Sequence, residues 1–316
     1  NVSFRGLTKF ENATFIVNAE FSKSRFGNMA LFNLANFSEA KFEYSTFDFD
    51  ANFYNASFLK SAVFDNSVFN GDALFEKANI SLASFEKATF RAEAYFFQTI
   101  FDDAHFNEAK VDRDLVFEGI KFRSPKSIIN LNNTRIEKLY GRWQFIRGHL
   151  EFNDEAYLHL IQNYKALGLR IDANDCYYEY RLAYEKRFFP IRRGLPLYPL
   201  SKNLVHRSID AINMLVYGYG VKPDRPFYFG SIMIIFISFF YWKFDNFNFA
   251  KALRFSATVF LSGSGRLLVK TPNYKPSSKE GTLQANILEM IFTFEQLLGA
   301  SIFVALLIGI NNTILW

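Results

Sequence analysis

Large apolar residues recur at steps of five or six in the first part of the chain. A small residue, most often Ala, stands two places before each of them, except before the last two, where Leu115 and Ile120 occupy that place. Neither the helical period nor the strand period gives this spacing, whereas a short-period solenoid does. The large positions are Phe10, Phe15, Phe21, Phe26, Phe32, Phe37, Phe42, Phe47, Phe53, Phe58, Phe64, Phe69, Phe75, Ile80, Phe85, Phe90, Phe96, Phe101, Phe106, Val111, Phe117 and Phe122.

With Ala two residues before Phe, the pattern over residues 4–122 resembles the Phe-rich form of the pentapeptide-repeat family. The resemblance implies a right-handed quadrilateral β-helix with one repeat on each side. The number of large positions then gives between five and six coils, and a rod about 25 Å long at about 4.8 Å per coil. We expect the rod to end near Leu115 and Ile120, and assign the first domain to residues 1–123.

The rod is expected to serve as a spacer or assembly platform. Some pentapeptide-repeat proteins imitate DNA and bind topoisomerases, which requires a strongly acidic surface. In this chain Lys77, Lys87, Arg91, Lys110 and Arg113 are interspersed with the acidic residues. The charge pattern therefore argues against DNA mimicry, and we expect no nucleic-acid partner.

Residues 124–200 are predicted to form a helical linker. The stretch up to about residue 150 is irregular, and two helices follow it, the first capped by Asn153 or Asp154 and ended by Gly168. The second begins near Asp172, and its Cys176 is most simply a buried apolar residue. Cys176 is the single cysteine of the chain, so no disulfide can form within one chain. The sequence therefore does not indicate an oxidising compartment.

Residues 201–225 are predicted to form an amphipathic helix and an elbow. Basic residues surround an apolar side in this segment, as in a helix that lies on an anionic membrane surface. An ordinary soluble helix would give the same pattern.

Residues 226–316 are predicted to form a membrane domain. Two uncharged apolar runs, 226–242 and 296–316, are long enough to belong to transmembrane helices, the second one extended back toward Leu283. A shorter apolar piece, 252–265, lies between them and is of the length of a re-entrant segment. The fold class is therefore a β-helix followed by two transmembrane helices that flank a re-entrant pore helix and loop.

The stretch from Phe294 to Ile310 resembles the inner helix of two-transmembrane potassium channels, through Glu295, Gly299 and a terminal Gly309. The stretch 255–260 resembles their pore helix. This resemblance implies a homo-oligomer of four subunits. The whole chain resembles archaeal pentapeptide-repeat membrane proteins with a channel-like C-terminus.

The filter tripeptide of potassium channels is absent from the expected place. Gly218-Tyr219-Gly220 precedes the first span, so we expect it to be an elbow that turns the chain toward the membrane. Potassium selectivity needs stacked rings of backbone carbonyl oxygens, and the residues after the pore helix do not have the sequence that forms them. The predicted filter and pore loop consists of Thr258, Val259, Phe260, Leu261, Ser262, Gly263, Ser264, Gly265 and Arg266.

The charge pattern favours anions, with chloride as the expected ion. Between Lys243 and Thr282 the basic residues outnumber the acidic ones, which would make the outer mouth of an oligomer positive. Small residues would let backbone N–H groups and the two serine hydroxyls approach the ion. In contrast, Glu289 and Glu295 would favour cations if they face the pore, although Glu295 can instead pack behind the pore loop.

Four further residues of the second span are candidates for the pore or the gate. Gly299 and Gly309 are either hinges or sites of close helix packing, and Asn311 and Asn312 either form a polar ring or meet lipid headgroups. The first hypothesis is thus an ion channel in the plasma membrane of a prokaryote, with the β-helix in the cytoplasm. A non-selective cation channel and a membrane-anchored scaffold without conduction are the alternatives. Scattered histidines give neither a metal site nor an enzyme centre, so no cofactor is expected.

Overall fold

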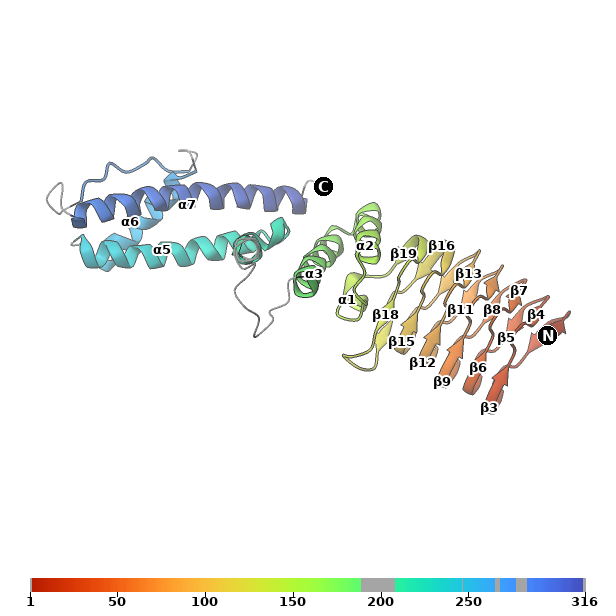
Figure 1. The fold of residues 1–316 in the computed structure, drawn as a ribbon. Helices are drawn as coiled ribbons and strands as arrows, with labels where there is room; N and C mark the ends of the chain where they lie inside the picture. The colour runs from red at the N-terminus through yellow and green to blue at the C-terminus, as the bar shows by residue number, and fades with distance from the viewer. Residues whose placement is uncertain (1, 189–207, 246, 265–267, 277–282, 315–316) are drawn as a thin grey trace. The chain divides into compact units, whose positions relative to one another are not determined.

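The computed structural model describes residues 2–188, 208–245, 247–264, 268–276 and 283–314. The chain forms two compact units, Asn1–Tyr180, here the solenoid unit, and Arg181–Trp316, here the helical unit. Figure 1 shows stacked strands in the solenoid unit and long helices in the helical unit.

Parallel strands build the solenoid unit in two sheets. The first sheet contains β1 (Ser3–Phe4), β2 (Thr8–Lys9), β4 (Arg25–Phe26), β5 (Ala30–Leu31), β7 (Thr46–Phe47), β8 (Ala51–Asn52), β10 (Val68–Phe69), β11 (Ala73–Leu74), β13 (Thr89–Phe90), β14 (Ala94–Tyr95), β16 (Lys110–Val116) and β19 (Arg135–Tyr140). The second sheet contains β3 (Thr14–Glu20), β6 (Asn36–Lys41), β9 (Ser57–Val63), β12 (Asn79–Ser84), β15 (Ile100–His105), β17 (Lys121–Phe122) and β18 (Ile129–Asn130).

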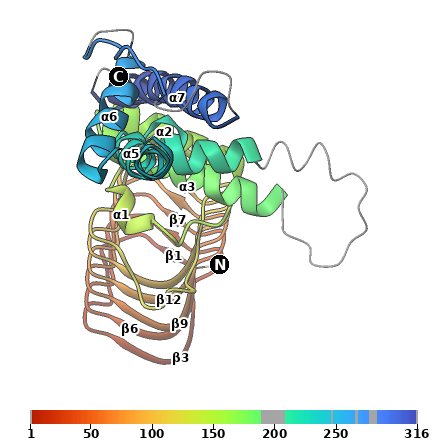
Figure 2. The same cartoon turned by 90° about the vertical axis from the view of Figure 1, so that its left-hand side faces the viewer.

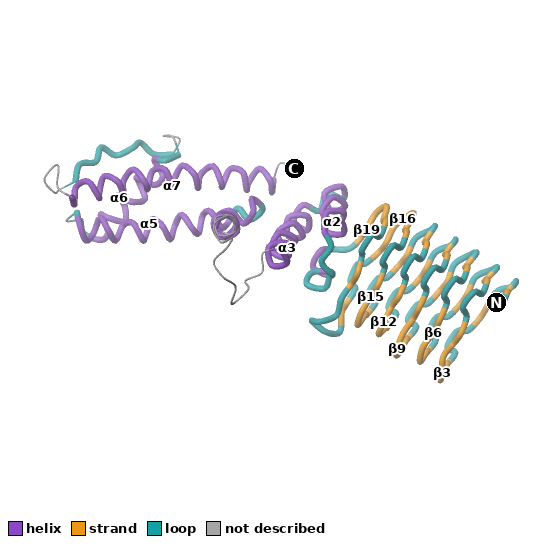
Figure 3. Tube along the Cα trace, in the orientation of Figure 1, coloured by secondary structure: helices purple, strands orange, loops and turns teal. Residues whose placement is uncertain are grey.

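Each strand pairs with the strand one coil further along the chain. Phe26 pairs with Phe47, and Phe47 pairs with Phe69, so four five- or six-residue repeats make one coil. Figure 2 shows the coils lying behind one another, with β3, β6, β9 and β12 along one side. In Figure 3 strands and turns alternate within every coil. The backbone of one coil therefore hydrogen-bonds to its neighbours, which explains how strands of two residues persist.

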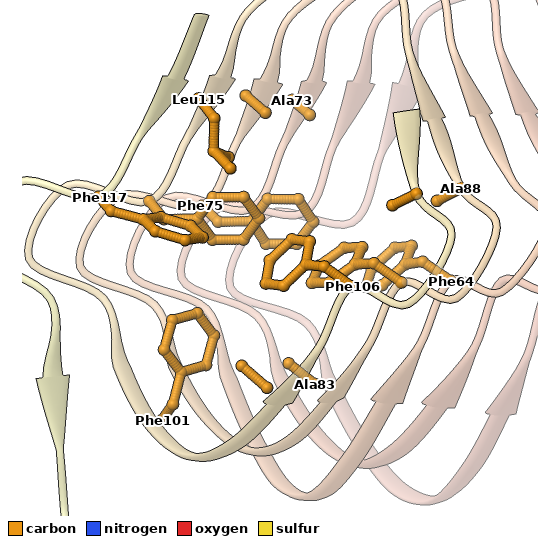
Figure 4. Packing of buried hydrophobic residues seen from close by; sticks show 14 of the residues in the cluster. Phe64, Ala73, Phe75, Ala83, Ala88, Phe101, Phe106, Leu115 and Phe117 are labelled. Carbon is orange, nitrogen blue, oxygen red and sulfur yellow. The ribbon is translucent and has the colours of Figure 1, made fainter. Parts of the chain in front are cut away.

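The phenylalanines stack in columns inside the coils, as predicted. Phe42 and Phe64 lie 4.8 Å apart between ring centroids, and their planes differ by 1°. Rings of neighbouring columns meet edge to face, as Phe64 and Phe75 do at 5.3 Å. Figure 4 shows the two central columns, with Ala73, Ala83 and Ala88 along the walls. Most of the small positions are buried as well, in the walls of the coils.

Two corners of each coil are tight turns with left-handed backbone. In the turn from Phe53 to Ala56, the Ala56 N–H donates to the Phe53 carbonyl, and Asn55 has a φ of 52°. This geometry is that of a type II turn, which favours Gly or Asn at its third position. Leu34 and Tyr44 occupy the same position with φ of 61° and 56°, so the stacked coils impose the turn on unfavourable residues as well.

The solenoid is longer than the Phe and Ala pattern predicts, with about seven turns in place of five to six. Leu115 and Ile120 are buried in the positions that Ala or another small residue holds in earlier coils, as Leu115 pairs with Ala94, and they do not end the rod. β18 and β19 then continue the ladders through a stretch that the sequence indicated to be irregular. The sequence pattern did not reveal these coils because Ile129 and Leu139 fill their interior in place of the repeated Ala and Phe residues.

Helices cover the last coil instead of forming a separate linker. They are α1 (Trp143–Ile146), α2 (Asp154–Ala166) and the beginning of α3 (Arg170–Phe188). The Asn153 side chain caps α2 as predicted, by accepting from the Ala156 N–H at 3.0 Å. Cys176 is buried in the same core, and this burial raises the pKa of its thiol. Residues 189–200 of the predicted linker lie outside the described residues.

One asparagine closes the edge of the last strand. Asn163 accepts from the Leu139 N–H at 3.0 Å and donates to the Leu139 carbonyl at 2.8 Å. Asp172 accepts from the Trp143 N–H and from the Arg142 side chain, each at 2.8 Å. An amide side chain thus takes the place of a further strand, and the helices satisfy the polar groups at this end of the sheet.

The helical unit begins with an elbow before its first long helix. Residues 208–212 are helical, and η1 (Asn213–Tyr217) and η2 (Gly218–Gly220) follow. Gly218, Tyr219 and Gly220 all have left-handed φ, between 52° and 77°, and a Cβ at Gly218 would lie 2.5 Å from Lys222 Cβ. The tripeptide therefore turns the chain before the first long apolar helix, where an elbow was predicted. Residues 201–207 of the predicted amphipathic helix lie outside the described residues.

Three helices make up the rest of the helical unit. α5 (Asp224–Phe244) and α7 (Leu283–Ile314) are long and apolar enough to span a membrane. The shorter α6 (Phe249–Ser262) packs against both of them, and α5 and α7 run side by side (Figures 1 and 3). The predicted long, short and long order of apolar segments is therefore present.

Candidate functional site

The predicted pore loop begins five residues later than expected. α6 runs through Ser262, so Thr258, Val259, Phe260 and Leu261 are helical. The first residue with helix-breaking character is Gly263, and the segment before it contains nothing that would end a helix sooner. Gly265 and Arg266 lie outside the described residues.

The serine hydroxyls at this helix end donate to carbonyl groups of α6. Ser262 Oγ donates to the Val259 carbonyl and Ser264 Oγ to the Leu261 carbonyl, each at 2.7 Å. Gln296 of α7 donates to Ser262 Oγ at 3.4 Å. Thr258 likewise donates to the Arg254 carbonyl. The hydroxyl protons are thus used within α6 in this conformation, and do not point to an anion as the sequence suggested.

Glycines bring α6 and α7 into backbone contact. A Cβ at Gly299 would lie 1.9 Å from the Phe260 carbonyl oxygen, and a Cβ at Gly263 would lie 2.2 Å from the Gln296 carbonyl oxygen. Gly309 lies against Pro223, at 3.1 Å by the same measure. Of the two roles considered for Gly299 and Gly309, close helix packing is the one that these contacts favour.

Glu295 lies in the interior of the helical unit, between α5 and α6. Its exposed fraction is 0%. Tyr241 Oη of α5 donates to Glu295 Oε2 at 3.1 Å, and Ser256 Oγ of α6 is hydrogen-bonded to Glu295 Oε1. The carboxyl group therefore joins three helices, and within one chain it does not face the outside.

Exposed charge around α6 and the loop after it is mostly positive. Among the described residues of this region, Glu289 of α7 is an exposed acid, whereas Asp245 is buried. The exposed basic residues in the described part of this region are Lys243, Lys251, Arg254, Lys270 and Lys275. The described part of this region therefore exposes mainly positive charge, as the sequence indicated.

Asp245 is held by the loop that follows α6. Tyr274 Oη donates to Asp245 Oδ2 at 2.8 Å, and Gln284 donates to the Phe244 carbonyl at 2.6 Å. Burial, with the bond to Asp245 in second place, raises the pKa of Tyr274. The first contact fixes the loop at the end of α5, and the second joins the start of α7 to the same end.

The end of α7 holds the last two predicted residues. Asn311 is half-buried, and the Asn312 side chain lies outside the described part of the structure.

A groove of about 620 Å³ lies beside α7 in the helical unit. It is lined by Asn213, Tyr217 and Gly220 and by residues of α7 from Leu297 to Ile308.

The sequence analysis missed three residues that hold these helices together. Tyr241 and Ser256 bind Glu295, and Gly230 lies 3.0 Å from the Phe260 ring by its ideal Cβ. A polar side chain inside an apolar run was the available signal for Ser256. No comparable sequence signal marked Tyr241, because a tyrosine near the end of a long apolar helix is also expected at a membrane interface.

Comparisons with known proteins reach the solenoid alone. A family model for pentapeptide repeats (9 copies) matches residues 32–79. Neither the curated proteins nor the solved structures contain a match to the chain. The chain therefore contains a pentapeptide-repeat β-solenoid followed by a helical region with two long apolar helices.

Proposed function

We propose that the protein is a homo-oligomeric membrane ion channel that carries a pentapeptide-repeat solenoid. The observation that carries the proposal is α6, a helix of 14 residues held between two membrane-length helices. At 1.5 Å per residue it is about 21 Å long, too short to cross a hydrocarbon core of about 30 Å.

The position of the end of α6 supports a pathway. Its last turn is held against Gly299, in the middle of α7. Non-helical backbone at membrane depth is tolerated where protein buries it or where it lines a water-filled cavity. In the proposed oligomer α6 is re-entrant, and the segment after Ser262 lines the pathway. Four copies follow from the channel-like resemblance of α7.

The ion is proposed to be an anion, with chloride favoured. The exposed basic residues around α6 would form a positive mouth in an oligomer, which attracts anions and repels cations. The buried position of Glu295 supports this choice, because its carboxyl group is not on the exposed side of α7.

A non-selective cation channel is the second candidate, and three observations favour it. The Ser262 and Ser264 hydroxyls donate to carbonyls and leave no proton for an anion. Glu289 is exposed on α7, and the C-terminal end of α6 carries partial negative charge.

In the proposed arrangement the solenoid, a right-handed quadrilateral β-helix, lies in the cytoplasm of a prokaryotic cell. Ile209, Ile212 and Leu215 are exposed before the first span, as in a segment that rests on a membrane surface. The solenoid then acts as a rigid platform on the inner side of the plasma membrane.

Bilayer recording of the purified protein under a KCl gradient tests the proposal. We expect a reversal potential near the chloride equilibrium value, and a shift toward cations in the double variant Lys270→Glu, Lys275→Glu. Lys60→Glu, an exposed change in the solenoid, is the matched control and should not shift it. A reversal at the potassium value supports the second candidate, and silence in a folded oligomer indicates a scaffold.

A further inference from the structure

The hydrogen bonds around Glu295 form a small closed set whose protons can be counted. Ser256 Oγ lies 3.0 Å from the Ile234 carbonyl oxygen of α5 and also contacts Glu295 Oε1. Tyr241 Oη lies 3.1 Å from Glu295 Oε2. Three hydrogen-bonded contacts thus connect four groups from α5, α6 and α7.

Each hydroxyl has one proton, and a carbonyl oxygen accepts only. Tyr241 uses its proton on Glu295 Oε2. Ser256 cannot donate to the Ile234 carbonyl and to Glu295 at the same time. If Ser256 donates to Ile234, the third proton must lie between Ser256 and Glu295, and Glu295 is the group that can supply it.

The surroundings of Glu295 agree with this count. The titratable groups that face it are Tyr241 from α5 and, behind Tyr241, Tyr274 and Asp245. From α6 the group that faces it is the Ser256 hydroxyl. In the part of the chain that the structure describes, no Lys, Arg or His pairs with Glu295. A buried carboxylate without a cation is far more costly than a neutral acid, which two hydroxyl groups satisfy.

We infer that Glu295 is a neutral carboxylic acid that donates to Ser256, accepts from Tyr241, and so fastens α6 to both long helices. Glu295 is then a positioning residue, because it fixes the depth of α6 without touching an ion. Ionisation at high pH removes the third proton and leaves Ser256 with two acceptors for one proton. The contact between α5 and α6 or that between α6 and α7 is then lost.

Infrared spectroscopy of the purified full chain in detergent micelles tests this inference, whether or not the protein conducts ions. At pH 7 we expect the carbonyl stretching band of a neutral carboxylic acid. Glu295→Gln should abolish the band, and Glu289→Gln, an exposed change on the same helix, should leave it in place. Ser256→Ala should shift its frequency, because the acid loses its acceptor. The absence of a neutral-acid band in the wild type, or a band unchanged in Glu295→Gln, overturns the inference.

Thermal unfolding gives a second, independent measurement. Glutamine can donate through its amide group to Ser256 and accept from Tyr241, so Glu295→Gln should keep the wild-type melting temperature. At alkaline pH its melting temperature should also fall less than that of the wild type, because Tyr274 still titrates in both proteins. A Gln variant that fails to fold, or that melts far below the wild type at pH 7, contradicts the inference, because an ionised carboxylate would then be the required group.

Discussion

The two units of this chain specify their packing in opposite ways. In the solenoid unit one short pattern is repeated, and every buried Phe meets nearly the same neighbours, as the 4.8 Å stacking of Phe42 on Phe64 shows. In the helical unit single residues decide the packing: Gly299 meets the Phe260 carbonyl, and Glu295 is bonded to two helices. Repetition spreads the stabilisation over many equal contacts, whereas unique packing concentrates it in a few positions.

The largest expected effect is in the repeated unit. Phe64→Ala removes a fully buried ring that stacks on Phe42 and Phe85. We expect the free energy of unfolding of the solenoid to fall by about 3–5 kcal/mol. Denaturant unfolding of the full chain, followed by hydrogen exchange in the solenoid strands, measures it.

Phe49→Ala is the control for this loss. The Phe49 side chain is 54% exposed, so its removal should change stability by less than about 0.5 kcal/mol. Equal losses for Phe49 and Phe64 would show that the columns do not hold the solenoid together.

Gly299→Ala tests the unique packing of the helical unit. Its new Cβ would lie 1.9 Å from the Phe260 carbonyl oxygen, and backbone on both sides leaves little room for adjustment. We expect α6 to separate from α7, with a loss of about 1–3 kcal/mol in the helical unit and a fall in melting temperature. Gly6→Ala, where nothing lies within 4 Å of the added Cβ, is the matched control. Tolerance of Ala at position 299 would refute the close contact.

Asn163→Ala tests the closure of the solenoid by its helices. It removes two hydrogen bonds to Leu139 and leaves the backbone groups of β19 without that partner. We expect a loss of about 1–3 kcal/mol and faster hydrogen exchange in β19 than in β9. Gln162→Ala, an exposed change on the same helix, should leave both unchanged. Uniform exchange in β9 and β19 would contradict a capping role.

The smallest expected effect is at the loop after α6. Tyr274→Phe removes the hydrogen bond to Asp245, which should cost about 1 kcal/mol. Because burial raises the pKa of Tyr274, the wild type should lose stability as the pH rises above about 10, where an unfolded tyrosine ionises first. Melting temperature measured against pH should show this loss in the wild type and a smaller one in the variant. Identical curves would exclude Tyr274 as the titrating group.

The sequence was sufficient wherever a pattern repeats. The register of Phe10 to Phe106 was readable because each coil places the same side chain in the same column. The continuation through β18 and β19 was missed, because Ile129 and Leu139 fill the interior there and do not follow the Ala and Phe pattern. In the helical unit, hydropathy indicated the three helices, and Glu295 was recognised as a residue that could pack behind the pore loop. Its partner Tyr241 and the end of α6 at Ser262 depend on contacts between segments distant in the sequence, which no local pattern contains.

Chloride flux into liposomes is the most direct measurement of the central proposal. Purified protein is reconstituted around a dye that chloride quenches, and chloride is added outside. We predict that the wild type quenches the dye faster than empty liposomes do, and faster than liposomes with an equal amount of Gly299→Ala. Flux no faster than that of empty liposomes, from protein shown to be folded and oligomeric in the same preparation, would contradict the account.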